Sequence, residues 1–167
     1  MKRLSASKII ATGVLLLVSI LSQSLNTLSA QGSHRFNVGS LVGDYSLINH
    51  YGANLALGIG TTHFDGNGQS RGTLLLNRPT ASGTRELVSL TSTGTYTVNE
   101  DGTGMIVLKV TLPDGTIKTA TEDFVITNTL WIWGRPLALV IETEQREESL
   151  VLGNGVFVTE TFTRRGD

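Results

Sequence analysis

The stretch 101-DGTGMIVLKVTLPDGT-116 contains the signals that decide the fold. Within Met105–Leu112 every second residue is apolar, which is typical of a β-strand with one face in a core and the other in solvent. Asp101-Gly102 precedes this segment and Pro113-Asp114-Gly115 follows it. Such residues favour the backbone angles of tight turns, so the stretch predicts a strand between two hairpins.

The same combination of alternation and turn residues recurs along the chain. Further tight turns are predicted at Asp65–Gly68 and Asn154-Gly155. Other strands are expected to begin at Tyr45 and to cover 54–64, 69–77, 85–91, 95–98, 116–127, 130–134, 137–144, 149–152 and 156–163. About eight to ten short strands, without a convincing amphipathic helix, predict an all-β fold. A single antiparallel up-and-down barrel of about eight strands is favoured because closure removes exposed edges, and a two-sheet β-sandwich is the alternative.

The N-terminal segment has the layout of a cleavable signal peptide. Three cations, Lys2, Arg3 and Lys8, lie at or before the start of an apolar run, Ile9–Leu21, and Leu28-Ser29-Ala30 offers a cleavage site. The run is too short for a comfortable transmembrane helix, although an uncleaved anchor is the alternative. The protein is therefore expected to be secreted or periplasmic.

Three regions follow from this layout. Residues 1–30 are assigned to the signal peptide, residues 31–42 to a flexible lead-in, and residues 43–167 to the antiparallel β-barrel domain. Gln31 is the expected new N-terminus.

Charge and composition exclude several classes of function. Of the 13 Lys and Arg residues three lie in the leader, so the mature chain has 10 cations against 14 acids and a net charge of −4. A weakly acidic domain without a basic stripe argues against nucleic acid, against an anionic membrane surface and against a stable membrane anchor after cleavage. The chain has no cysteine, which excludes disulfides, thiolate metal sites and a lipid-modified cysteine. Its oligomeric state stays open.

Three short motifs suggest a family resemblance. They are Gly43-Asp44-Tyr45-Ser46-Leu47, the turn Phe64–Gly68, and Gly94–Val98 with Asp101–Gly104. Together they resemble uncharacterised exported bacterial small β-barrel proteins of the calycin (lipocalin-like) or allene-oxide-cyclase-like type. The resemblance implies a fold rather than an activity. It also implies a structural latch, in which Arg164 or Arg165 near the last strand packs on Tyr45 in the first, where lipocalins have tryptophan.

Candidate binding residues are few. Trp131 and Trp133 share one side of their strand and could floor a ligand pocket, with core filling or barrel-end capping as the alternative. Tyr96 has the same ambiguity. His63 ends a strand on the Leu55-Leu57-Ile59 face, which could place it at a barrel mouth.

Metal and catalytic motifs are weak. His34, His50 and His63 lack ligand spacing, and the Asp65 turn lacks the oxygens of a calcium loop, so no metal or other cofactor is indicated. Among carboxylates, Glu122 adjoins Asp123, and Glu142 and Glu144 share a strand face. The latter pair could act as acid and base, but a solvated face is favoured because further acids follow.

These observations favour an exported, non-catalytic binding module for a small, partly apolar ligand. The alternatives are a structural or interaction protein with a filled barrel, and a cofactor-free isomerase or cyclase. Interior polarity separates the three. An interior filled by Leu, Val and Phe would favour the structural protein, and an empty cavity without acids would favour the binding module. A cavity with a buried Glu or a Tyr-water pair would favour the isomerase.

We expect protein recovered from the periplasm or the medium to have lost its leader. Its intact mass should correspond to a chain that begins near Gln31. A full-length mass in the membrane pellet would contradict this prediction.

Overall fold

The computed structural model describes residues 35–166, so the predicted signal peptide and Gln31–His34 lie outside the described residues. The described chain forms a 3-10 helix and eight strands. Their bounds are η1 (Val38–Ser40), β1 (Val42–Tyr51), β2 (Ala56–Asp65), β3 (Gln69–Pro79), β4 (Arg85–Val98), β5 (Thr103–Thr111), β6 (Ile117–Ile132), β7 (Arg135–Gln145) and β8 (Val158–Arg164).

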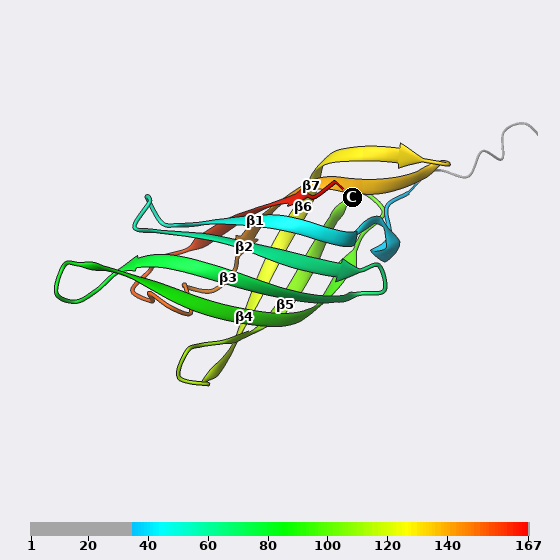
Figure 1. Ribbon diagram of the computed structural model, residues 1–167. Coiled ribbons are helices and arrows are strands. Elements are labelled where there is room, and N and C mark those ends of the chain that lie inside the picture. The colour runs from blue at the N-terminus through cyan, green and yellow to red at the C-terminus, as the bar shows by residue number, and fades with distance from the viewer. Residues whose placement is uncertain (1–34, 167) are drawn as a thin grey trace, which may run out of the picture. The chain divides into compact units, whose positions relative to one another are not determined.

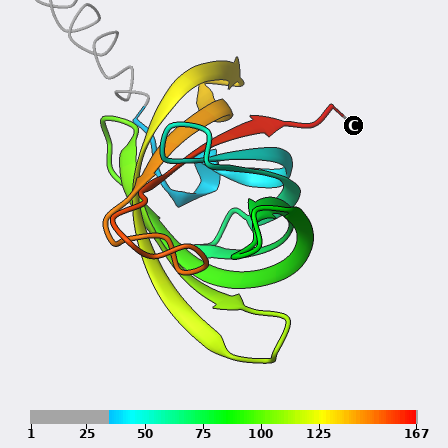
Figure 2. The same cartoon turned by 90° about the vertical axis from the view of Figure 1, so that its left-hand side faces the viewer.

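Each strand pairs antiparallel with the next, and β8 returns to pair with β1 (Figures 1 and 2). The closing ladder runs from Tyr45 opposite Arg164 to Tyr51 opposite Val158. The prediction of an eight-stranded up-and-down barrel is confirmed, and the sandwich alternative is wrong. One predicted strand, 149–152, is also wrong. The Ser149 hydroxyl accepts hydrogen bonds from the amides of Val151 and Leu152 and holds this segment in a turn.

The predicted aspartate turns form by one mechanism. The side chains of Asp65, Asp101 and Asp114 each accept a hydrogen bond from the amide two residues later, at 2.7, 3.0 and 2.9 Å. Hydrogen bonds lower the pKa of all three carboxyl groups, chiefly from the Gln69 amide to Asp65, the Thr103 hydroxyl to Asp101 and the Thr116 amide to Asp114. Three of the tight connections between strands therefore rest on local chemistry that the sequence displays.

The apolar face of β2 points away from the barrel interior. Ile59 is 63% exposed and Leu57 is also exposed, whereas the alternate positions, including Gly58 and Thr62, are buried. The reason is space. A Cβ at Gly60 would overlap the carbonyl oxygen of Thr73 on β3, so this inward position accepts no side chain.

Aromatic rings close the barrel at the end where η1 lies. The ring of Phe64 packs edge-on against Tyr45, Tyr96 and Phe162, with centroid distances of 5.3, 5.2 and 5.7 Å. The buried Tyr45 hydroxyl donates to the carbonyl of Ala138 at 2.7 Å, and that of Tyr96 donates to Leu41 at 2.8 Å. Because both hydroxyls have partners, this end is a solid core. A second, smaller apolar cluster around Tyr51 and Leu76 lies toward the other end.

Arg164 lies over Tyr45 in the way the resemblance implies. Its guanidinium carbon is 6.0 Å from the centroid of the Tyr45 ring, and the guanidinium donates a hydrogen bond to the carbonyl of Val42. Gly43 allows this approach, since it has a φ of +97° and a Cβ there would lie 2.8 Å from the Arg164 Nη1 atom. Arg165 is exposed, and its amide donates to the carbonyl of Asp44. Energetic coupling across this contact stays a prediction.

We expect the Tyr45–Arg164 contact to couple the two ends of the barrel sheet. Tyr45→Ala should lower the free energy of unfolding by roughly 3 kcal/mol or more, because a fully buried ring is lost. Arg164→Ala should cost less, ~0.5–2 kcal/mol, and Arg165→Ala should have little effect. Denaturant titrations of the single and double variants should show coupling of ~0.5 kcal/mol or more for Tyr45 with Arg164 only. Additive effects would contradict the latch.

Candidate functional site

A cavity lies inside the barrel, between the aromatic end and the loop that joins β7 to β8. The space open to the centres of water molecules is about 60 Å³. One water needs ~10–15 Å³ on this measure, so the cavity has room for on the order of four waters. Apolar side chains make up much of its wall, including Leu47, Leu74, Leu90, Ile106, Leu108 and Phe162.

A row of polar side chains crosses one wall of this interior. Strand register places Asn49 on β1 opposite Glu160 on β8, and Glu160 opposite Thr143 on β7. Glu122 on β6 lies opposite Gln145 on β7. All five are buried, with Glu122 only 1% exposed and Glu160 7%. Two carboxyl groups in a largely apolar interior are costly to keep, so they need an explanation beyond folding.

The polar row is only partly hydrogen-bonded. The Asn49 amide group donates to Glu160 Oε1, and the Gln145 amide donates to the carbonyl of Glu148 at 3.0 Å. In the described residues, four buried polar atoms have no hydrogen-bond partner: Asn49 Oδ1, Ser70 Oγ, Glu122 Oε2 and Thr143 Oγ1. Asn49 Oδ1 can only accept a hydrogen bond, and Glu122 Oε2 accepts when ionised. Ser70 and Thr143 are hydroxyls that can donate or accept, so the site holds both unused acceptors and unused donors.

Burial raises the pKa of both carboxyl groups. For Glu122 the pKa rises to about 7, because the ionised form loses its hydration and the charge of Glu147 opposes it. For Glu160 burial is again the largest cause of a raised pKa, and Glu122 adds to it by charge repulsion. Tyr51, which also lines the cavity, has its pKa raised by burial and by Glu160. Burial and mutual repulsion thus both favour the protonated forms of these two acids over two negative charges.

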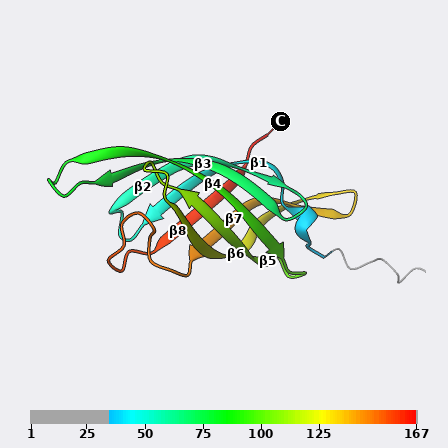
Figure 3. The ribbon, with the colours of Figure 1, turned by 90° about the horizontal axis from the view of Figure 1, so that it is seen from below.

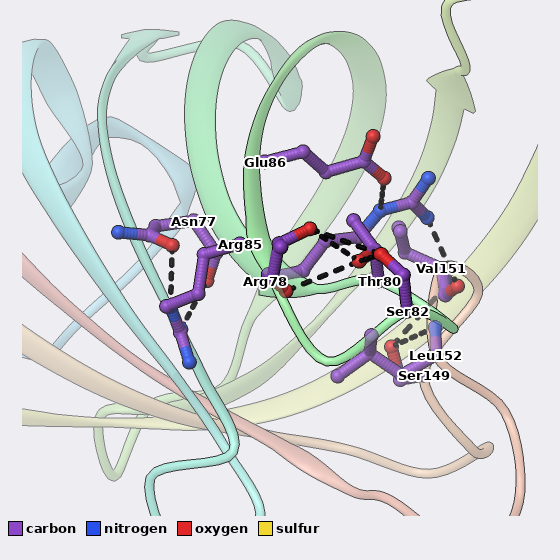
Figure 4. Close-up of polar contacts among 10 residues, drawn as sticks. Asn77, Arg78, Thr80, Ser82, Arg85, Glu86, Ser149, Val151 and Leu152 are labelled. Atoms are coloured by element: carbon purple, nitrogen blue, oxygen red, sulfur yellow. Dashed lines mark hydrogen bonds and ion pairs between the residues drawn. The ribbon is translucent and has the colours of Figure 1, made fainter.

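The loop between β7 and β8 covers the cavity, since Ser149, Leu150 and Val151 line it. Lys118 on β6 and Arg78 on β3 hold this loop by hydrogen bonds to its carbonyl groups. The Lys118 ammonium donates to Leu150 at 2.8 Å, and the Arg78 guanidinium donates to Val151 at 3.4 Å (Figure 4). Arg78 is itself positioned by a 2.7 Å hydrogen bond to Glu86. The loop is also held by its own hydrogen bonds, such as that from the Ser149 amide to the Val156 carbonyl, and by packing of Val151 and Leu152 on the second apolar cluster.

The four binding residues predicted from sequence lie elsewhere. Trp131 and Trp133 are exposed on the β6–β7 hairpin, and Tyr96 belongs to the aromatic core. His63 lies on the outer surface of the barrel, where its Nδ1 is 2.8 Å from Asp44 Oδ1. None of the four lines the cavity.

Sequence reasoning did not single out the buried acids as a pair. The sequence suggests Glu122 only as the neighbour of Asp123. In the barrel the two side chains lie on opposite faces of β6: Glu122 points inward, and Asp123 points outward and pairs with Arg146. Glu142 and Glu144 are exposed. A signal was present nonetheless. Glu122 is in phase with Ala120 and Phe124, and Glu160 with Val158 and Phe162, so each acid interrupts an otherwise apolar strand face.

The described residues, 35–166, contain neither a cluster of His, Asp and Glu suited to hold a metal ion nor a helix long and apolar enough to cross a membrane. Neither the family models, nor the curated proteins, nor the solved structures contain a match to this chain. The calycin resemblance therefore stays a prediction.

We expect stability to fall as pH rises from 5 to 8. Ordinary glutamates ionise near 4.5, so in this range the unfolded chain loses protons that the folded Glu122 and Glu160 retain. Their raised pKa values thus stabilise the fold at low pH and lose this effect as pH passes about 7. The free energy of unfolding should drop by ~1 kcal/mol or more between pH 5 and 8.

The paired variant Glu122→Gln/Glu160→Gln should flatten this dependence in urea titrations. Glu142→Gln/Glu144→Gln, on the exposed face of β7, is the matched control and should keep it. Equal pH dependence in the two double variants would contradict the assignment.

Proposed function

We propose that the barrel binds a small molecule with an apolar body and a hydrogen-bond-donating head, an amine or a hydroxyl group. The observation that supports this most directly is the pair of buried, unpartnered oxygens, Glu122 Oε2 and Asn49 Oδ1, in a cavity with largely apolar walls. An apolar cavity with a few convergent polar groups is the usual form of a ligand site. Export through the signal peptide remains part of the proposal.

Asn49 Oδ1 and an ionised Glu122 Oε2 can only accept and so favour a ligand that donates, whereas the Ser70 and Thr143 hydroxyls fit either kind of ligand. A buried acceptor without a partner costs ~1–3 kcal/mol, and a ligand that donates to it recovers this energy on binding. An amine would also stabilise one ionised carboxylate of the Glu122–Glu160 pair, because a cation nearby lowers the pKa of an acid. A carboxylate ligand would meet like charge and should be rejected.

The size of the cavity sets a limit on the ligand. Space for on the order of four waters suits a small head group and a short chain. A longer ligand requires displacement of Leu150 and Val151, and hence release of the contacts from Lys118 and Arg78. Entry past the β7–β8 loop is therefore part of the proposal.

Three probes of equal chain length test the proposed selectivity: n-pentylamine, 1-pentanol and pentanoate. The amine and the alcohol should raise the thermal midpoint at millimolar concentration, since they bind the folded state, and pentanoate should not. Glu122→Gln should weaken the binding of the amine about tenfold or more and should weaken the binding of the alcohol less. Glu142→Gln, an exposed acid, is the control. The proposal would be contradicted if all three probes raised the thermal midpoint equally. It would also be contradicted if the amine raised the midpoints of Glu122→Gln and Glu142→Gln equally.

Acid–base catalysis is a second candidate, because the cavity holds two acids and a buried Glu is the feature expected of an isomerase. With one carboxyl protonated and its neighbour ionised, the first can donate a proton to a ligand while the second removes one. Deuterium exchange at the α-carbon of a small ketone such as cyclohexenone should then exceed the buffer rate. Exchange should disappear in both Glu122→Gln and Glu160→Gln. Exchange at the buffer rate with wild-type protein would exclude this candidate for that substrate class.

A further inference from the structure

The hairpin of β6 and β7 extends beyond the barrel (Figures 1 and 3). The ladder of β6 with β5 ends at Val125, and that of β7 with β8 ends at Val140. Beyond these points the two strands pair only with each other, up to Ile132 opposite Arg135. The base of this ribbon still belongs to the barrel core, since Ala138 is fully buried and its carbonyl accepts a hydrogen bond from the Tyr45 hydroxyl, whereas its tip, Leu130–Trp133, is exposed.

The tip of this ribbon is apolar on both faces. Leu130, Trp131 and Ile132 are consecutive, so their side chains alternate between the faces, and all three are exposed. Trp133 follows at the turn and is 98% exposed. A ribbon that belongs in water carries polar residues on at least one face. This tip instead has the composition of a segment with apolar surroundings on both sides.

Trp133 occupies a turn position that does not suit it. Trp133 has a φ of +50° and Gly134 one of +75°, the pattern of a type I′ turn. Asparagine or glycine is preferred at the first of these positions, whereas a bulky residue with positive φ is an outlier. A fully exposed tryptophan at that position contributes nothing to the packing of the fold. The hairpin therefore gives up local stability to present this ring.

Within its own sequence the hairpin carries one charge, and the nearby Glu100 is paired with Arg35. Residues 124–141 contain no acid, although the chain has 14, and Arg135 is the single charged residue among them. This absence of anions is compatible with phosphate head groups, and the arginine is placed where it can contact them. The contact needs no basic stripe, since apolar burial rather than net charge would supply the affinity.

The N-terminal segment joins the barrel at this same end. Phe36 packs against Trp131, with ring centroids 6.3 Å apart, and its amide donates to the carbonyl of Glu100. Phe36 therefore adds a further aromatic ring beside the hairpin.

We propose that the β6–β7 tip, Leu130–Trp133, inserts into the interfacial region of a lipid bilayer. Tryptophan is enriched at this depth because its ring is apolar while its indole N–H can reach polar head groups. A bilayer also fits a ribbon that is apolar on both faces, whereas a protein partner would ordinarily cover one. Self-association through the tip is the competing outcome that the test must separate.

The two tryptophans of the chain both lie on this tip, so intrinsic tryptophan fluorescence reports on it alone. Adding phosphatidylcholine vesicles to the full chain should shift the emission to shorter wavelength, and lipids brominated near the head group should quench it. Trp133→Asn leaves Trp131 as reporter and places Asn-Gly, the preferred pair, in the turn. This variant should partition to vesicles about tenfold or more weakly, with a thermal midpoint equal to or above that of the wild type.

Phe157→Ser removes an exposed aromatic ring at the other end of the barrel and is the matched control, expected to keep the lipid-induced shift. The leader is present in every variant, so its own affinity for lipid cannot produce a difference between them. Three results would overturn the proposal: no spectral change with vesicles, an equal change in wild type and Trp133→Asn, or a change that depends on protein concentration without lipid. The last result would indicate a contact between copies of the chain.

Discussion

The ladder between β1 and β8 joins the first strand of the barrel to the last, and most of the features described above depend on it. It places the Arg164 guanidinium over the Tyr45 ring, and it places Asn49 beside Glu160. Without closure, the polar row across β1, β8, β7 and β6 would be two separate groups on the edges of an open sheet. The hydrogen bonds that remove the sheet edges therefore also assemble the candidate site.

The two ends of the barrel are built on different principles. At one end, aromatic rings and tyrosine hydroxyls with satisfied hydrogen bonds form a rigid core around Phe64. Toward the other end, the interior contains acids and unpartnered oxygens under a loop held by Arg78 and Lys118. The free energy gained by packing the aromatic end can offset the cost of burying acids and unpartnered oxygens in the rest of the interior. Such an arrangement is common where a site must stay open to a ligand.

The fold could be predicted from sequence because its signals are local. Aspartate–glycine turns and the alternation within Met105–Leu112 depend on neighbouring residues; the turns form, and Ile106, Leu108 and Val110 line the barrel interior. The site was missed because it depends on residues far apart, Asn49 with Glu160 and Glu122 with Gln145, which only strand register brings together. The face of β2 was hard to read for a related reason. Its glycines lie inside where neighbouring strands leave no room, so hydrophobicity alone points to the wrong side.

Closure of the sheet also governs when the chain is able to fold. Because residues 45–51 pair with residues 158–164, the ladder cannot form until almost the whole domain is available. Contacts this distant in sequence make folding slow, and β1 retains an open edge in the meantime. A nascent chain with that property stays unfolded for longer during synthesis. Until residues 158–164 are available, β1 therefore presents an edge that can pair with other chains.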